Sequence, residues 1–265
     1  MQREIVYLRP DQILNEIAIC PVAYLPFGLI EWHGPHLPLG VDALNASAVA
    51  RLAAENTGGL VFPTCFLGTE RERSPQMLEW LGLPVDDYIV GMDFPANPLP
   101  SLYASEEVFG LVVREQLRLA LTWGFKLVVL LSGHAAENQL AVLDRLVAEF
   151  NASGHCQVMV ALPFVQNLSG VMEVGHASKI ETSVMLSLHP ETVAVENLPE
   201  IPTPLRNVDW AIIDYQTFLG DPALDRTVHL EDDPRLASAE TGRQTIQRAV
   251  QQISSQVNAL KQNWT

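Results

Sequence analysis

Residues 28–42, GLIEWHGPHLPLGVD, hold the side chains best suited to chemistry in this sequence. Glu31 and His33 lie two positions apart at the end of an apolar run, and in a strand that spacing places both side chains on one face. Asp42 follows His33 by nine residues, after a turn rich in Gly and Pro. Carboxylate and imidazole groups are ligands that suit Zn²⁺ or Mn²⁺. A lone Glu-x-His is more often an ordinary polar strand end, so this segment alone does not decide the function.

A second imidazole follows another apolar run, in residues 126–138, KLVVLLSGHAAEN. The run is typical of a buried parallel strand and leads directly to His134. Ligand sites of open parallel sheets gather at the carboxyl ends of the strands. His134 could instead cap the helix that follows. One strand end carries an imidazole with two carboxylates, and the other carries a second imidazole. This combination favours a metal site. His36 could orient one of the ligands of that site.

A third candidate segment is GHASKIETSVML, residues 175–186. His176 precedes a predicted helix whose first turn carries Glu181. A carboxylate in that place could simply stabilise the helix dipole, and spacing alone favours neither this role nor a catalytic one. The remaining histidines, His155, His189 and His229, are isolated in the sequence and are assigned to surface or packing.

Short apolar runs alternate with longer amphipathic stretches, and these elements must position the candidate residues. The predicted strands are 22–30, 60–67, 126–131 and 157–162; the predicted helices are 43–55, 106–123 with Gly124 as its cap, 139–150, one from near 181 and one after 239. This alternation predicts an α/β fold, a single domain with a mostly parallel sheet and helices on both faces. Residues 70–104 have few helical signals and predict an inserted, lid-like segment.

Composition excludes several classes of protein. The 31 acidic against 16 basic residues give a net charge of −15, which would repel nucleic acid. No apolar run reaches the roughly 18 residues of a membrane span. The three cysteines are widely spaced, with no CxxC pair, which is typical of buried thiols in a reducing compartment and predicts a cytoplasmic protein. The sequence has no GxSxG motif and no cysteine in a nucleophile motif, which argues against a serine or cysteine hydrolase. It also has no GxGxxG motif, which argues against a dinucleotide-binding enzyme.

Together the three segments resemble the creatininase (creatinine amidohydrolase) family. Its members carry a Glu-x-His-Gly-Pro-His-Leu-Pro run with a following Asp, an Asn-Gly-His-Gly-Gly-Asn turn and a His-Ala-Gly-Glu-x-Glu-Thr-Ser segment. Here these read EWHGPHLPLGVD, SGHAAEN and HASKIETS. The resemblance covers about residues 26–243, and its first motif is highly specific.

The resemblance implies a creatininase-like fold and hydrolysis of a cyclic or linear amide C–N bond at two divalent ions, Zn²⁺ and/or Mn²⁺, with Fe²⁺ also acceptable. Two such ions lower the pKa of water towards about 7. By position, Glu31 and His134 would hold one ion, His33 the other, and Asp42 would bridge them. His176 matches a catalytic histidine, and Glu173 or Glu181 could share its proton transfer.

The chain also departs from the family pattern. Creatininase takes a metal ligand from a Glu two residues after the His134 position, where this chain has Ala136, so Glu137 is the candidate replacement. Gly175 stands where a glutamate is expected, and no tryptophan precedes His176 to stack on a creatinine ring. Creatinine is therefore expected to be a poor substrate.

Substrate contacts are predicted from the start of the 70–104 segment. Arg71 and Arg73 offer planar donors to an acidic or hydroxylated substrate, and surface ion pairs are an equal alternative. His36 is the third candidate for substrate binding.

Other functions stay open: a same-family hydrolase of a polyhydroxylated cyclic ketone, a lactone or a formamide, or a non-catalytic binding or assembly module. A small-molecule substrate and a homo-oligomer are the expected partners, and the resemblance favours a hexamer. Apolar residues in 77–83, 94–103 and 208–220 agree with such an interface. The sequence names neither the substrate nor the physiological metal.

Overall fold

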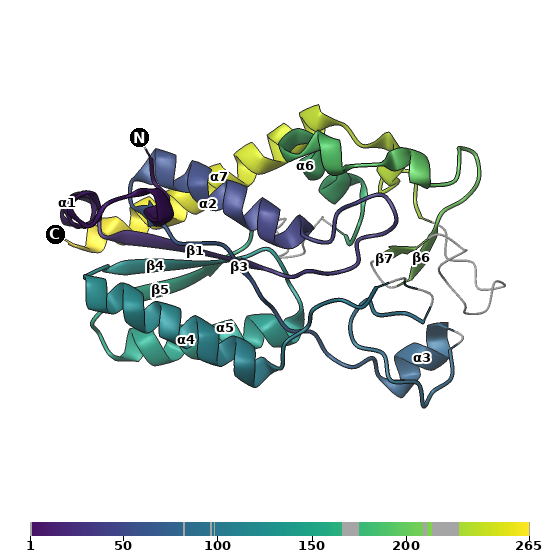
Figure 1. The fold of residues 1–265 in the computed structure, drawn as a ribbon, viewed down its shortest axis with the longest axis horizontal. Coiled ribbons are helices and arrows are strands. Elements are labelled where there is room, and N and C mark those ends of the chain that lie inside the picture. Colours follow the sequence, from purple (N-terminus) through teal and green to yellow (C-terminus); the bar gives the residue numbers. More distant parts are fainter. Residues whose placement is uncertain are drawn as a thin grey trace.

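A parallel sheet organises the computed structural model, which describes residues 2–81, 83–95, 97, 99–165, 175–208, 211–213 and 228–264 (Figure 1). The strands of this sheet are β1 (Val22–Gly28), β2 (Leu60–Val61), β3 (Cys65–Phe66), β4 (Leu127–Ser132) and β5 (Gln157–Ala161). Their order is β2-β1-β4-β5. β2 pairs with the start of β1, and β3 pairs with the end of β1. All of these pairings are parallel.

Helices cover both faces of the sheet (Figure 1). One face carries α2 (Val41–Thr57), α6 (Lys179–Leu188) and α7 (Ala239–Lys261), and the other carries α4 (Glu106–Trp123) and α5 (Glu137–Ala152). Alternate residues of β1 enter the two cores: Val22 and Tyr24 pack with α2 and α7, while Leu25 and Phe27 pack with α4 and α5. All seven β1 residues are buried, which explains the continuous apolar run. The predicted fold class is confirmed.

The remaining elements are shorter. They are the helices α1 (Pro10–Ile19) and α3 (Pro75–Leu81), the antiparallel pair β6 (Arg206–Val208) and β7 (Ala211–Ile213), and the 3₁₀ turns η1 (Ile5–Tyr7), η2 (Pro190–Thr192), η3 (Val195–Asn197), η4 (Pro234–Leu236) and η5 (Gln262–Trp264). Within the described ranges, no helix combines the length and apolar character needed to cross a bilayer.

The structure corrects three details of the sequence analysis. The strand predicted over 60–67 is two strands, because Pro63 lies between them and has no N–H to donate to a ladder. Residues 75–81 are helical, since Pro75 suits a first helical turn and the Ser74 hydroxyl accepts the Met77 N–H. In the apolar stretch 77–83, Leu78 and Leu83 are not exposed, because they are buried in a cluster with Trp32, Ile89, Met92 and Phe94.

The chain leaves the neighbouring strands β1 and β4 towards opposite faces of the sheet. β1 leads to α2, whereas β4 leads to α5. The two strands are in register as far as Phe27 and Ser132, so their carboxyl ends open into one crevice. Ligands of open α/β sheets bind at such a switch point. Figure 1 shows α3 on this same side of the molecule.

Candidate metal centre

Two glycines place the first turn of α2 directly over the ends of β1 and β4. A Cβ on Gly28 would lie 2.2 Å from the Ala43 nitrogen, and one on Gly133 would lie 2.1 Å from the Asp42 carbonyl oxygen. Both distances are shorter than any contact that a real Cβ atom makes, so a residue with a side chain would clash with α2 at either position. Only glycine allows the helix to pass this close. Asp42, in that first turn, is therefore held between the two strand ends.

The Asp42 carboxylate faces two imidazoles. Its Oδ1 is 3.3 Å from His33 Nε2, and its Oδ2 is 3.4 Å from His134 Nδ1. Glu31 Oε2 is 3.6 Å from the same His134 nitrogen, and Glu181 Oε2 is 3.9 Å from His33 Nε2. The Asp42 carboxylate thus has an imidazole and a further carboxylate on each side: His33 with Glu181, and His134 with Glu31. A carboxylate shared by two metal ions needs this arrangement.

These side chains form three sets of donor atoms, each within 4.8 Å of one another: Glu31, His33 and His176; Glu31, Asp42 and His134; and His33, Asp42 and Glu181. Glu31 Oε2, Asp42 Oδ2 and His33 Nε2 are buried and have no hydrogen-bonding partner among the described residues. Buried polar atoms are normally satisfied, so unsatisfied ones that converge indicate a bound cation. Oxygen and imidazole donors fit Zn²⁺ or Mn²⁺.

The charges of the cluster depend on one another. Burial raises the pKa of Glu181 to about 8 and also raises the pKa of Glu31. Burial alone would lower the pKa of His33, but the adjacent Asp42 carboxylate raises it to about 10. Burial would raise the pKa of Asp42, but the adjacent His134 and His33 imidazoles hold it well below its usual range. Histidine ligands bind metal in the neutral form, so metal binding here would release protons.

His176 has a different environment from His33. Its Nε2 lies 2.6 Å from the Trp32 carbonyl oxygen, which can only accept, so Nε2 carries the proton. Its Nδ1 lies 3.8 Å from Glu31 Oε2. Burial, followed by the charge of the nearby His33, lowers the pKa of His176 well below its usual value. His176 is therefore held as a neutral imidazole whose unprotonated Nδ1 faces Glu31.

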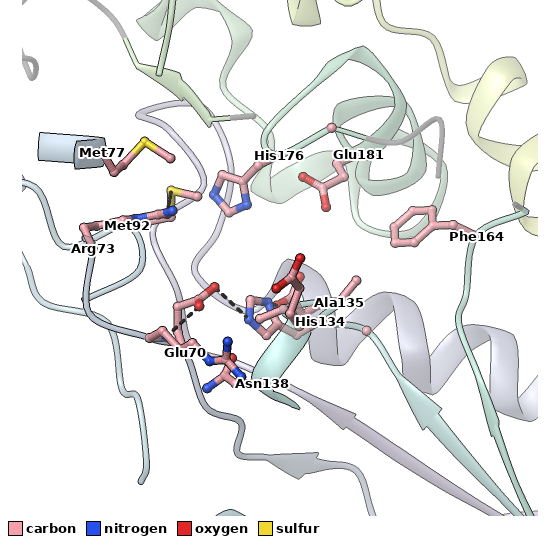
Figure 2. A pocket seen from close by; sticks show the side chains of 16 residues that line it. Glu70, Arg73, Met77, Met92, His134, Ala135, Asn138, Phe164, His176 and Glu181 are labelled. Atoms are coloured by element: carbon pink, nitrogen blue, oxygen red, sulfur yellow. Dashed lines mark hydrogen bonds and ion pairs between the residues drawn. The ribbon is translucent and has the colours of Figure 1, made fainter. Parts of the chain in front are cut away.

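A cavity of about 590 Å³ opens over these residues (Figure 2). Its lining includes Glu70, Arg71, Arg73, Met77 and Met92 from the 70–104 segment, and Asp42, His134, Phe164, His176 and Glu181 from the rest of the chain. Figure 2 shows Met77, Met92 and Arg73 on one side, and Phe164 on the other. The segment thus walls the pocket of its own chain.

The predicted site residues differ in how they meet this pocket. Arg71 and Arg73 line it; the side chain of Arg71 is 57% exposed, and Arg73 Nε donates to the Gly91 carbonyl oxygen at 2.8 Å. Glu137 lines the pocket but belongs to none of the three donor sets. His36 is buried and does not line the pocket.

His36 instead supports the site from behind. Its Nε2 is 3.0 Å from the Thr182 hydroxyl, next to Glu181 in α6. Burial, with the charge of His33, lowers the pKa of His36 to about 4. A substrate contact by His36 stays a prediction, and Glu173 lies outside the described residues.

Two further residues, neither of them predicted from the sequence, contact the donors. Glu70 Oε2 is 3.5 Å from His134 Nε2, and the Tyr103 hydroxyl donates to Glu31 Oε1 at 2.6 Å. They lie at the two ends of the 70–104 segment. Their positions depend on contacts with distant parts of the chain, for which no local pattern exists.

Comparison with known proteins agrees with this geometry. The family model described as "Creatininase: Creatinine amidohydrolase" matches residues 8–257. Creatinine amidohydrolase of Pseudomonas putida is 24% identical over 252 residues, which cover 89% of this chain and 88% of that protein. The mycofactocin precursor peptide peptidase of Mycobacterium tuberculosis (strain CDC 1551 / Oshkosh) is 27% identical over 216 residues, covering 76% and 75%.

Solved structures give the same fold. A crystal structure of creatinine amidohydrolase (creatininase) has a TM-score of 0.70 and 22% identity, with 97% of each chain covered. A creatininase variant of Zn-Zn type has a TM-score of 0.70 and 24% identity, with 98% of each chain covered. The resemblance stated from the sequence is confirmed.

Proposed function

We propose that this chain, which belongs to the creatininase family, is a metal-dependent amidohydrolase that cleaves the C–N bond of a small amide. The observation that carries the proposal is the position of Asp42. Its two carboxylate oxygens face His33 and His134 separately, at 3.3 and 3.4 Å, and Asp42 Oδ2 and Glu31 Oε2 are buried without a hydrogen-bonding partner among the described residues. Known relatives include an amidohydrolase and a peptide peptidase, both of which hydrolyse C–N bonds by name.

The donor sets divide naturally between two ions. Glu31, Asp42 and His134 would hold one, and His33, Asp42 and Glu181 the other. Zn²⁺ or Mn²⁺ bound there would supply Lewis acidity and activate water near neutral pH. Solved creatininases of Zn-Zn and Mn form support this choice of metals. Glu181 then serves as a ligand, in place of the proton-transfer role that its spacing left open.

His176 is the residue we assign to proton transfer. His176 lines the pocket, its Nε2–H is anchored on the Trp32 carbonyl, and its Nδ1 faces Glu31 Oε2 at 3.8 Å. A neutral imidazole with a fixed tautomer can take a proton from water and return it to the leaving nitrogen. Glu137 and Glu173 remain candidates for assisting roles.

The pocket supports a substrate larger than creatinine. A volume of about 590 Å³ lies within the roughly 300–1,000 Å³ that holds a drug-sized ligand. Arg71 and Arg73 on one wall favour an acidic or hydroxylated amide, and Met77 and Met92 beside them favour an apolar part. A short peptide with a free carboxylate is the second candidate, which the peptide peptidase relatives favour.

Metal analysis with a substrate panel tests the proposal. The panel holds creatinine, linear and cyclic amides with and without a carboxylate, short peptides, formamides, lactones and polyhydroxylated cyclic ketones. We expect two ions per chain and the fastest turnover on an acidic amide or peptide, with creatinine slow. A protein that binds no divalent ion and turns over nothing would instead be a non-catalytic binding module, and the proposal would be wrong.

We also propose that the protein is a homo-oligomer, with a hexamer favoured. Leu99 and Leu102 of the 70–104 segment are 58% and 62% exposed, and Tyr88 is 77% exposed. Apolar side chains this exposed on one segment favour an interface there. Analytical ultracentrifugation at micromolar concentration tests this: a single 29.2 kDa species would refute it.

A further inference from the structure

We infer that Glu70 and Tyr103 are positioning residues, which fix the orientations of two metal-binding side chains, His134 and Glu31. The 70–104 segment would then be part of the metal centre's support as well as the wall of its pocket. This inference rests on the proposed function, since it assumes that His134 and Glu31 bind metal.

Tyr103 holds one oxygen of Glu31. The Tyr103 hydroxyl lies 2.6 Å from Glu31 Oε1 and 2.9 Å from the backbone nitrogen of Met92. Since the Met92 N–H can only donate, the hydroxyl accepts from it and gives its own proton to Glu31. Glu31 Oε2 is left to face His134, at 3.6 Å. The hydroxyl therefore selects which oxygen of Glu31 is available as a ligand.

Glu70 lies on the other side of the His134 ring. Its Oε2 is 3.5 Å from His134 Nε2, the ion-pair contact drawn in Figure 2, and Nε2 makes no hydrogen bond within the described residues. Nδ1 of the same ring faces Asp42 and Glu31. Metal-binding histidines commonly give their second N–H to a carboxylate, which fixes the tautomer and the ring orientation. In the metal-bound protein, a proton on Nε2 directed at Glu70 would leave the Nδ1 lone pair for the ion. Glu70 Oε1 accepts the Arg71 N–H at 2.7 Å, which fixes the Glu70 carboxylate in turn.

Glu70 is anchored through its neighbours. The Thr69 N–H donates to Gln139 Oε1 in α5 at 2.8 Å, and the Gln139 amide nitrogen donates to Ser132 at the end of β4. Residues 71–73 and 89–91 pair with one another through backbone hydrogen bonds of 2.7 and 3.0 Å. The start of the segment is thereby tied to the same strand end that carries His134.

Tyr103 is anchored in the same way at the other end of the segment. The Leu102 N–H donates to the Ile30 carbonyl at 2.8 Å, and the Ala104 N–H donates to the Gly68 carbonyl at 2.9 Å. These bonds flank Tyr103 on both sides, so its backbone runs beside the loop that carries Glu31. The hydroxyl contact is therefore a consequence of backbone pairing.

Gly91 lies where the two side chains converge. A Cβ at this position would be 2.3 Å from the Tyr103 hydroxyl and 2.5 Å from Glu70 Cγ, and its φ of +53° also favours glycine. Only a residue without a side chain allows Glu70 and Tyr103 to approach the donors from one direction. The glycine therefore makes room for both contacts of the segment, that of Glu70 with His134 and that of Tyr103 with Glu31.

Zinc affinity measured by competition with a chromogenic chelator tests the inference in the full-length protein. The variants are Glu70→Gln and Tyr103→Phe, both nearly isosteric. Their controls are Glu72→Gln and Tyr88→Phe, at exposed positions of the same segment. Each test variant should bind one of the two ions about 10–100-fold more weakly, as expected for the loss of a partner that orients a ligand. The affinity of the other ion and both affinities of the controls should not change. In the metal-free protein, Glu70→Gln should keep the parent's melting temperature, whereas Tyr103→Phe should lower it slightly, because the Met92 N–H loses its acceptor.

Nitrogen-15 NMR of the histidines gives a second readout. In the zinc-loaded parent, His134 should be protonated at Nε2 alone, and Glu70→Gln should weaken that preference. A parent that binds no zinc would overturn the proposed function itself. A parent with two ions, whose affinities both variants retain within twofold, would overturn this inference alone. Equal weakening of both ions with a lower metal-free melting temperature would also overturn it, because that result indicates general structural damage.

Discussion

The two sides of the candidate metal centre are built in different ways. Glu31, His33, Asp42 and His134 follow regular strands or begin a helix, and the sheet register and two glycines fix their relative positions. The opposite side is the 70–104 segment, which short backbone pairings attach to the strand ends. Regular elements hold a constellation more precisely than loops do, and loops vary more freely. We therefore expect metal binding and catalysis to depend on the strand-end residues. We expect substrate choice, and smaller changes in metal affinity, to depend on the 70–104 segment.

Asp42→Asn should have the largest effect. If Asp42 serves both ions, its loss should remove both and lower kcat/KM roughly 10³-fold or more, which is about 4 kcal/mol. Metal content by mass spectrometry and turnover of the best panel substrate measure this. Asp11→Asn, at an exposed site in α1, is the control. Two ions retained by Asp42→Asn would show that the carboxylate is not shared.

Gly133→Ala should have the next largest effect. Its Cβ would lie 2.1 Å from the Asp42 carbonyl, so α2 must move away from the strand end. Overpacking of this kind costs about 1–3 kcal/mol of unfolding free energy, and the shift of Asp42 should weaken both ions. Urea unfolding and zinc titration measure the two effects. In the control, Gly110→Ala, the nearest neighbour is a Val142 methyl at 3.3 Å; an equal loss in that variant would contradict the explanation.

Arg71→Ala tests the other side of the comparison. Its guanidinium lines the pocket and is half-exposed, 3.9 Å from Glu106. For a substrate with a carboxylate we expect KM to rise about tenfold, or 1.4 kcal/mol, with kcat and metal content unchanged. A neutral amide should show no difference. Arg114→Ala, on the exposed side of α4, is the control. A fall in kcat or the loss of an ion would place Arg71 among the groups that act on the metal centre.

The sequence predicts the first side of the site much better than the second. Buried runs ending in Glu31, His33 and His134 locate two strand ends, and parallel sheets bring such ends together. Glu70 and Tyr103 carry no such signal, because their positions follow from single long-range bonds such as Thr69 to Gln139. Spacing also leaves the role of Glu181 open, since only the packing of α6 brings it within 3.9 Å of His33.

The smallest effect on the metal centre is expected at Asp233, which lies next to the start of α6. The buried Asp233 accepts from Arg235 Nη2 at 2.6 Å, and the neighbouring Asp232 carbonyl accepts the N–H of Lys179, the first residue of α6. Asp233→Asn should lower the free energy of unfolding by about 1–2 kcal/mol at pH 7, since a charged hydrogen bond is lost. It should leave metal binding unchanged.

The pH dependence of that loss identifies its cause. Burial would raise the pKa of Asp233, but the hydrogen bonds and charge of Arg235 hold it below its usual range. A carboxyl whose pKa is lower in the folded state stabilises the protein above its unfolded pKa of about 4, and this stabilisation is lost as pH falls through the folded pKa. Urea unfolding of the metal-free parent and variant should therefore show a gap that is constant from pH 7 to 5 and narrows below pH 4. A gap that persists at pH 2 would mean that the asparagine disturbs packing, and that the ion pair with Arg235 contributes little to holding α6.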